Sequence, residues 1–547
     1  MHFKNYIAQK IERVVRQRWP ELDDLPRIDL AYPPEERFGD YTTTLALQLA
    51  PRLKMNPLEI AKIIIADLGK ISAVRQMSVV APGFINFFLD SRWLARQVGE
   101  ITLRKTAAVK IDVGHGQRVV VEYVSANPTG PVTMANGRGA FSGDTLSRVL
   151  RFTGYRVKRE YYLNDVGNQV NILAESVLRR YWINQGIKME YPDYCYQGDY
   201  VSDLARRINV PNYTLQNAEK IQEIKDKIKG RILTKMVVDI ERLLEKKLNV
   251  HYDTWFSEKS LYTSGLVDRT LQQLKELRLL FKFEGAIWLK MKDAGEKQDH
   301  VLIKADEQPT YFLSEIAYLY DKFIRRKIDR YIWLIGADHH GHAQRIKTAH
   351  RMLGLPGIVD VILMQFVRLI RNGEEVKMSK RAGTFVTLEE LVDEVGVDAA
   401  RYFFLMHDFN SHMDFDLNLA KKQSKDNPVY YVQYAHTRIC SILKKAKSLK
   451  TDGTQLLPKE THPSEVRLIK QLIRWPELLT DVAVSYQVHR LPTYATELAT
   501  AFHDFYTQCR VIDGATVIGH RQKLVRATQI ILQHVLATMG ITAPENM

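Results

Sequence analysis

Two segments in which a β-branched run leads through a turn into a helical pattern constrain the fold more than any other feature. The first is RVVVEYV at 118–124, which runs into SANPTGP and then into a helical pattern. The second is YIWLI at 331–335, which ends in the turn GADHHGH and is followed by a helical pattern up to residue 353. Each is half of a βαβ unit, so together they predict a parallel sheet with its ligand site at the carboxyl ends of the strands.

Patterns outside these two segments divide the rest of the chain. Apolar residues at helical spacing from Phe3 on, a helical pattern at 57–68 and a strand-like run at 83–89 predict a compact N-terminal α+β unit. The stretch between the two strand-to-helix segments is rich in charge and helical pattern, as at 220–248, and predicts a large insertion. From Asn427 onward the pattern is uniformly helical and predicts a bundle.

The charge balance indicates a polyanionic partner. The 547 residues contain 78 Lys+Arg against 63 Asp+Glu, a formal net charge of +15, and the basic runs are spread along the chain. Attraction to nucleic-acid phosphates is the usual reason for such a surplus, and a well-solvated cationic surface is the alternative. No run approaches the ~18 apolar residues of a membrane span, and the N-terminus lacks an apolar signal core. The three cysteines are too far apart for a C-x-x-C pair, so we expect a cytoplasmic protein.

The loop after the first predicted strand, residues 125–131, has the features of a phosphate-binding turn. It ends a strand, contains Gly130 and leads through Gly137 into a helix, so that backbone N–H groups and a helix N-terminus can face a phosphate. A tight turn with glycine for packing explains the same pattern. Glycine spacing alone leaves both interpretations open.

Residues 375–384, EVKMSKRAGT, are predicted to form a cationic loop, because Thr387 and Glu390 make a capping box that starts the next helix. The ammonium groups of Lys377 and Lys380 can close over a triphosphate and neutralise the charge that develops as pyrophosphate leaves. A solvated surface is the alternative, since K-x-x-K by itself is common there.

Asp338, His339, His340 and His342 form the densest His/Asp cluster in the chain and follow a predicted strand. One interpretation is the metal site of a phosphoesterase, because Asp and His are common metal ligands. The sequence shows no second carboxylate-rich strand end that would complete a two-metal site. Nucleotide contact and ordinary turn residues are the other two interpretations.

Seven segments, taken in order along the chain, carry a resemblance to a known family. They are VEYVSANPTGP…NGRG from 121, YLNDVGNQ at 162–169, TYFLSEIAYLYDKF at 310–323, GADHHGH at 336–342, VKMSKRAGTFVTL at 376–388, DFDLNLAKKQSKDNPVYYVQYAH at 414–436 and a terminal Met547. Over essentially its whole length the chain resembles a bacterial arginyl-tRNA synthetase of class I.

The resemblance implies an α/β protein with three domains. Residues 1–112 would be an N-terminal α+β domain that binds the tRNA D-loop, and residues 413–547 a C-terminal all-α anticodon-binding bundle. Between them, residues 113–412 would form a Rossmann-type catalytic core that carries the HIGH and KMSK signatures and an insertion at about 170–300.

Carried over position by position, the resemblance also implies the residues of the site. The amino-acid pocket would contain Glu122, Asn127, Tyr311, Glu315 and Gln344, and the Glu315 carboxylate would hold the substrate guanidinium through two parallel bonds. The catalytic residues would be Thr133, Asn136, Lys377 and Lys380. ATP would contact Gly130, Gly137, Asp338, His339, His340, Met378 and Ser379, and the tRNA D-loop would contact Phe84 and Asn86.

Two places depart from the family pattern. Glu315 stands where the pattern has Asp, and the longer side chain moves the carboxylate outward. The HIGH signature should stand at 133–136 but reads Thr-Met-Ala-Asn, which leaves a hydroxyl and an amide as donors. Because losing one transition-state donor can cost ~10²–10³ in rate, we expect an altered rate of arginine activation. A tRNA-binding paralogue with weak or no aminoacylation is therefore an alternative function, against which the intact KMSK segment argues.

The reaction that the resemblance implies is ATP-dependent ligation of L-arginine to tRNA(Arg) through an arginyl-adenylate. ATP with Mg²⁺ would be a substrate, no permanently bound metal is expected, and the protein would act as a monomer. The arginine carboxylate would attack the α-phosphate, and the 2′-hydroxyl of the terminal tRNA adenosine would then take the arginyl group. The resemblance implies that tRNA binds before arginine is activated.

Overall fold

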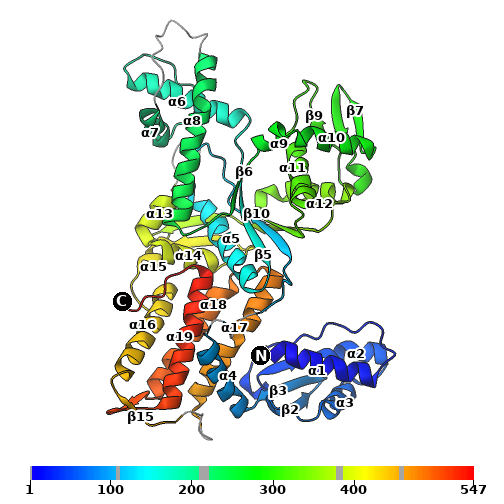
Figure 1. Cartoon of the computed structure of the whole chain (residues 1–547), viewed down its shortest axis with the longest axis vertical. Helices are drawn as coiled ribbons and strands as arrows, with labels where there is room; N and C mark the ends of the chain where they lie inside the picture. Colours follow the sequence, from blue (N-terminus) through cyan, green and yellow to red (C-terminus); the bar gives the residue numbers. More distant parts are fainter. Residues whose placement is uncertain (1–2, 106, 108–110, 209–220, 377–385, 455–460) are drawn as a thin grey trace.

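The computed structural model describes residues 3–547 except 106, 108–110, 209–220, 377–385 and 455–460. Figure 1 shows a central sheet domain with two lobes above it, a helix bundle below it and the N-terminal unit beside the bundle. The sheet domain thus lies at the junction of all the other parts.

Five parallel strands form the central sheet, in the order β11-β10-β4-β5-β6. Their bounds are β4 Arg118–Glu122, β5 Arg156–Leu163, β6 Thr254–Ser257, β10 Arg330–Gly336 and β11 Ile358–Met364, and helices α5 (Met134–Phe152) and α12 (His340–Met352) follow β4 and β10. The three valines of β4 are almost fully buried, as expected for a strand covered on both faces. The strand order reverses between β4 and β10, and ligands of such sheets bind outside the carboxyl ends of the strands at that point.

Two lobes are inserted between strands of the central sheet. The first lies between β5 and β6, has a core of its own, and consists of α6 Asn168–Asn184, α7 Asp199–Arg207, α8 Ile221–Glu241 and the π-helical turn Arg242–Lys247. The second lies between β6 and β10 and consists of α9 Lys259–Thr263, α10 Leu266–Glu276, an antiparallel sheet of β7 Leu280–Phe283, β8 Ala286–Leu289 and β9 His300–Ile303, then α11 Tyr311–Tyr320 and the π-helical turn Asp321–Arg325. The stretch predicted as one insertion at about 170–300 is therefore divided by β6, which pairs with β5. A four-residue strand, TWFS, is too short to stand out by its periodicity.

The N-terminal unit is an antiparallel sheet of order β1-β3-β2 covered by helices. Its elements are α1 Phe3–Arg18, the 3₁₀ turn Glu36–Phe38, β1 Tyr41–Thr43, α2 Leu45–Leu53, α3 Pro57–Leu68, β2 Val74–Val80 and β3 Phe84–Leu89. The next helix, α4 (Ser91–Arg104), packs against α17 and α19 of the bundle (Figure 1). Its buried face of Trp93, Leu94, Val98 and Ile101 explains this placement.

The last part of the chain is mostly helical. A small sheet of β12 Val367–Arg371, β13 Glu374–Glu375 and β14 Met413–Asp416 joins the core to the bundle together with α13 Leu388–Val395, α14 Val397–Leu405 and α15 Leu417–Lys421. The bundle consists of α16 Pro428–Ala446, α17 Pro463–Ser485, α18 Arg490–Gln508 and α19 Gly519–Met539, with three two-residue strands, β15 Lys450–Thr451, β16 Ile512–Asp513 and β17 Thr516–Val517, at one end.

The predicted fold class is confirmed: a Rossmann-type parallel sheet core stands between an N-terminal α+β unit and a C-terminal helical bundle. The boundaries at residues 112 and 412 stay predictions. Within the residues that the structure describes, no helix is long and apolar enough to span a bilayer.

Candidate functional site

The chain makes a strained turn where β4 ends, at the switch point of the sheet. Val124 (φ 68°) and Ser125 (φ 40°) both have left-handed backbones, which non-glycine residues adopt at a cost of about 1–3 kcal/mol each. The hydroxyl of Ser125 accepts the Tyr162 N–H at 3.0 Å and so ties this turn to β5. Such strain clusters at functional sites, and the sequence pattern alone did not single out these two residues.

Thr133 and Asn136 form the cap of α5 beside this turn. The Asn136 Oδ1 accepts the Thr133 backbone N–H at 3.1 Å and its hydroxyl at 2.9 Å. Thr133 is only 8% exposed and its hydroxyl is engaged in the helix cap, and its predicted catalytic role stays a prediction. The Asn136 amide nitrogen donates to no other group among the described residues and keeps its capacity to bind a phosphate.

Of the two predicted phosphate-binding glycines, Gly137 is required for packing. A Cβ at Gly137 would stand 2.8 Å from Leu388 and from Phe404. Gly130 lies in the loop before α5, close to Tyr200 of the first lobe, whose hydroxyl donates to the carbonyl of Thr129 at 2.8 Å. Close packing, one of the two interpretations left open by the sequence, thus accounts for Gly137.

The structure describes only part of the predicted cationic loop, residues 375–384. Lys377, Met378, Ser379 and Lys380 lie outside the described residues. The segment that follows them is anchored at the start of α5: Met134 N–H donates to the Val386 carbonyl at 3.1 Å, and Leu388 N–H to the Val132 carbonyl at 2.9 Å. Thr387 and Glu390 form the predicted capping box of α13. The loop therefore rejoins the described chain next to the cap of α5.

Asp338, His339 and His340 are exposed at the carboxyl end of β10, where α12 begins. The Asp338 carboxylate lies 3.6 Å from the His339 Nε2. No group of three or more His, Cys, Asp or Glu side chains arranged to hold a metal ion is found among the described residues. These three side chains are accessible to a ligand at the switch point.

A cavity of about 790 Å³ opens between α11, α12 and the sheet of the second lobe. Tyr311 and Glu315, two of the predicted pocket residues, line it from α11. Phe281, Phe283 and Trp288 form an aromatic wall on the opposite side. The cavity is thus lined by aromatic residues and by charged residues of both signs, among them Glu315 and Arg345.

Tyr311 is positioned by a glycine at the start of α6. A Cβ at Gly167 would stand 2.3 Å from the Tyr311 hydroxyl, and the φ of Gly167 is +91°. Both the close approach and the backbone conformation require glycine here. The ring of Tyr311 remains 53% exposed, at the mouth of the cavity.

Glu315 presents an incompletely satisfied carboxylate beside this cavity. Its Oε1 bonds to the His342 Nε2 at 2.6 Å. Its Oε2 is shielded from solvent and has no hydrogen-bond partner among the described residues. An unsatisfied buried acceptor costs about 1–3 kcal/mol, so a ligand that donates to it would be strongly favoured.

Glu258, which sequence reasoning missed, lies behind Glu315. It accepts the Ser314 hydroxyl at 2.9 Å and, in the amide orientation that satisfies its neighbours, the Asn164 amide at 3.0 Å. Burial, with the nearby charge of Glu315, raises the pKa of Glu258 to about 7 although the Ser314 bond opposes the rise. We call Glu258 and Glu315 the acid pair. The described residues supply neither of them with a Lys or Arg partner.

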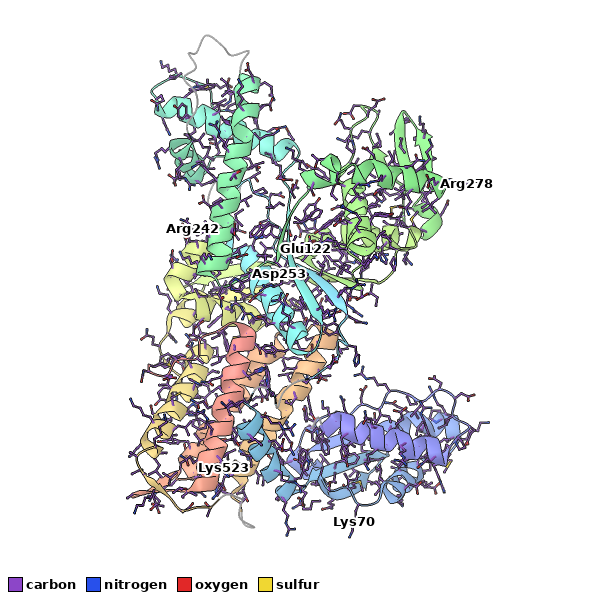
Figure 2. All side chains as sticks on the ribbon, viewed as in Figure 1. Lys70, Glu122, Arg242, Asp253, Arg278 and Lys523 are labelled. Atoms are coloured by element: carbon purple, nitrogen blue, oxygen red, sulfur yellow. The ribbon has the colours of Figure 1, made fainter. Side chains whose placement is uncertain are left out.

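Glu122, predicted in the amino-acid pocket, is buried at the end of β4, near the centre of the molecule (Figure 2). Its Oε2 accepts from the Lys322 Nζ at 3.0 Å and from the hydroxyls of Tyr318 at 3.0 Å and Tyr331 at 2.8 Å. Glu122 does not line the cavity. Its Oε2 is therefore already held, whereas its Oε1 accepts only the Ser125 hydroxyl, at 3.4 Å, among the described residues.

Glu160 on β5 completes this arrangement. It pairs with Lys322 at 2.9 Å and with Arg326. Burial opposes its ionisation, but Lys322 and Arg326 outweigh burial and lower the pKa of Glu160 to about 2. We call Glu122, Glu160, Lys322 and Arg326 the buried ion cluster.

The remaining predicted residues are not brought to the cavity. Gln344 on α12 and Asn127 in the loop after β4 are exposed and do not line it, and the Asn127 amide donates to Gln169 at 2.8 Å. In the N-terminal unit, Asn86 is buried in the middle of β3 and Phe84 is half-buried at its start. Their contact with tRNA stays a prediction.

Three regions of the chain match known protein families. Residues 1–89 match the family described as arginyl tRNA synthetase N terminal domain, residues 97–416 the tRNA synthetases class I (R), catalytic domain, and residues 432–547 the DALR anticodon binding domain. The catalytic-domain match alone spans more than half of the chain.

Full-length relatives agree with these matches. The chain is 40% identical to the arginine--tRNA ligase of Heliobacterium modesticaldum over 99% of this chain and 98% of the relative. It is 41% identical to that of Dehalococcoides mccartyi over 100% and 99%. The fold is also that of Thermus thermophilus arginyl-tRNA synthetase, with a TM-score of 0.78 over the full length of both chains at 21% identity.

Proposed function

Because this chain belongs to the class I arginyl-tRNA synthetases and has arginine--tRNA ligase activity, we propose that it forms arginyl-adenylate between the acid pair and the two helix N-termini at the switch point of its sheet. The observation that supports this placement best is the Glu315 carboxylate, whose buried Oε2 lacks a partner beside the cavity.

The arginine side chain binds at the acid pair. Glu315 holds the guanidinium through charge-assisted bonds, and Tyr311 covers it at the mouth of the cavity. Glu258, with its pKa raised to about 7, adds negative charge behind Glu315 only as the pH rises through that value. Glu122 has a structural role at the site, because its Oε2 is already held by Lys322 and two tyrosines.

ATP, which enters as its magnesium complex, binds across the N-termini of α5 and α12. Asn136 donates its free amide N–H to a phosphate oxygen, and His339 and His340 lie at the start of α12 beside it. Gly130 lets the backbone come close to the nucleotide, and Thr133 holds Asn136 in place. Lys377 and Lys380 neutralise the departing pyrophosphate, a step that favours the transition state over bound ATP.

The tRNA contacts all three domains, and the net charge of +15 favours its extended phosphate backbone. Phe84 and Asn86 contact the D-loop of the tRNA, and the bundle from about residue 413 binds its anticodon. One chain supplies every element of this site, and we propose a monomer that acts in the cytoplasm, where ATP and tRNA are available.

Arginine-dependent exchange of pyrophosphate into ATP, measured with purified protein and tRNA(Arg), tests this proposal. Wild type should catalyse exchange only when both arginine and tRNA are present. The variant Lys380→Ala should lose ~10²–10³ in the exchange rate with little change in tRNA affinity. Equal losses in exchange and in tRNA binding would overturn the role given to Lys380.

A further inference from the structure

The Glu315 carboxylate is held in place by a chain of two further side chains on α12. The His342 Nε2 lies 2.6 Å from Glu315 Oε1, and the His342 Nδ1 lies 3.3 Å from the Arg345 Nη2. The ring of His342 also stands edge-on to Trp333, with centroids 5.7 Å apart. His342 is therefore fixed on three sides.

Arg345 determines which nitrogen of His342 carries the proton. A guanidinium has only N–H groups and cannot accept a hydrogen bond, so the Nδ1 of His342 must be the acceptor. The proton of the neutral ring then lies on Nε2 and is donated to Glu315. On its other side, Arg345 bonds in the same way to the Nδ1 of His300 at 3.5 Å.

We propose that His342 is a positioning residue for arginine recognition, held by Arg345 as a neutral Nε2–H donor that orients the Glu315 carboxylate without neutralising it. This inference rests on the proposed function. It assigns to His342 the task of steering a glutamate whose longer side chain would otherwise have more freedom than aspartate. The full negative charge of Glu315 then remains available to the substrate guanidinium.

A positively charged His342 would have the opposite effect. An imidazolium would form an ion pair with Glu315, compete with the guanidinium for its charge and weaken arginine binding. Arg345 occupies the Nδ1 lone pair with an N–H donor, so in this arrangement Nδ1 carries no proton.

The series of side chains Glu315, His342 and Arg345 involves titratable and charged groups from three elements. Glu315 faces His342 from α11, Arg345 from its own helix α12, and His300 reaches Arg345 from β9. Burial and the charge of Arg345 lower the pKa of His300, while Glu296 and Asp299 oppose that shift. The control variants below keep these groups in place, so their charges contribute equally to each comparison.

The first test compares His342→Ala with His342→Gln in tRNA-dependent pyrophosphate exchange. Loss of a hydrogen bond to a charged group predicts a roughly 10- to 100-fold rise in the KM for arginine in His342→Ala, with a smaller change in kcat and none in the KM for ATP. The Gln amide can place an N–H donor near the position of Nε2, so His342→Gln should recover most of the loss. His350→Gln, on the same helix but bonded to the Pro356 carbonyl, is the matched control and should leave the KM for arginine unchanged.

The second test examines the role of Arg345 in fixing His342. Arg345→Met removes the N–H donor that holds the Nδ1 of His342, so the KM for arginine should rise in this variant. Arg345→Lys, which keeps a cationic donor, should stay close to wild type.

The possible outcomes separate this inference from the proposed function. A wild-type protein without arginine-dependent exchange would contradict the proposed function itself. An active wild type with an unchanged KM for arginine in His342→Ala, or in Arg345→Met, would overturn the positioning role alone. If His342→Ala is too unstable to assay, His342→Gln and the two Arg345 variants still decide the question.

Discussion

Two groups of carboxylates lie in the same domain and differ in what balances their charge. In the buried ion cluster, Glu122 and Glu160 face Lys322 and Arg326, and two tyrosines complete their hydrogen bonds. In the acid pair, Glu258 and Glu315 have only neutral or weakly basic neighbours, and one oxygen has no partner among the described residues. The first group is internally complete, whereas the second lacks a cation.

This difference separates scaffold from binding site. Burying charges is costly unless they are paired, so the cluster holds β4 and β5 to the π-helical turn after α11 and has no need of a ligand. In the acid pair, the free-energy cost of a shielded carboxylate without a cationic partner remains until a positively charged ligand binds. Variants in the two groups should therefore affect different measurable properties.

The largest effect is expected from breaking the buried ion cluster. Glu160→Gln leaves Lys322 and Arg326 with one carboxylate fewer, and loss of one partner of a buried pair costs about 3–5 kcal/mol. The free energy of unfolding, from urea denaturation, should fall by that amount. Glu12→Gln, in the exposed pair with Arg16, should cost less than about 0.5 kcal/mol. A stable Glu160→Gln protein that has lost arginine activation would place Glu160 in the binding site instead.

The raised pKa of Glu258 in the acid pair should make the free energy of unfolding depend on pH. The pKa of Glu258 is about 7 in the folded protein against an ordinary 4.5, so the folded chain keeps a proton that the unfolded chain has released between these values. Its favourable contribution is complete below pH 4.5 and is lost as the pH rises to 7, about 3 kcal/mol in all.

Glu258→Gln removes this dependence. The unfolding free energy of the variant relative to wild type should therefore increase between pH 5 and pH 7.5, measured by urea denaturation at each pH. Parallel curves for the two proteins would show that Glu258 ionises in the folded state as it does in a free chain.

The smallest effect should come from Thr133 in the cap of α5, whose hydroxyl is already paired with Asn136. Thr133→Ala removes a buried helix cap and should lower the unfolding free energy by about 1 kcal/mol. Because the hydroxyl is held by Asn136, the exchange rate at saturating ATP should change little. A loss of ~10² or more in exchange, with unchanged stability, would return Thr133 to the catalytic residues.

Hydrophobic periodicity in the sequence predicted those helices and strands in which the periodicity is strong. The helix at 57–68 and the strands that begin at Arg118 and near Tyr331 are where hydrophobic periodicity places them. The strand β6 was missed, because four half-buried residues give no clear period. Glu258 directly follows β6, so the rule that places ligand residues at strand ends would have found it had that strand been recognised.

The site residues show what one sequence leaves undetermined. Sequence motifs pointed to Glu122 and Glu315 alike, but only their neighbours in space, Lys322 for one and His342 for the other, show which carboxylate is already balanced. These partners come from elements far apart in the chain. Likewise, the Thr133 hydroxyl could be assigned to the helix cap only once its distance from Asn136 was known.

The most direct test of the account compares the binding of L-arginine with that of L-citrulline, its neutral isostere, by titration calorimetry with tRNA(Arg) present. If the unbalanced charge of the acid pair selects the cation, wild type should prefer arginine by ~10² or more, since leaving a buried charge unpaired costs several kcal/mol. In Glu315→Gln the preference should fall below ~10, with no large loss of unfolding free energy. A Glu315→Gln protein that still prefers arginine as strongly as wild type would contradict the account.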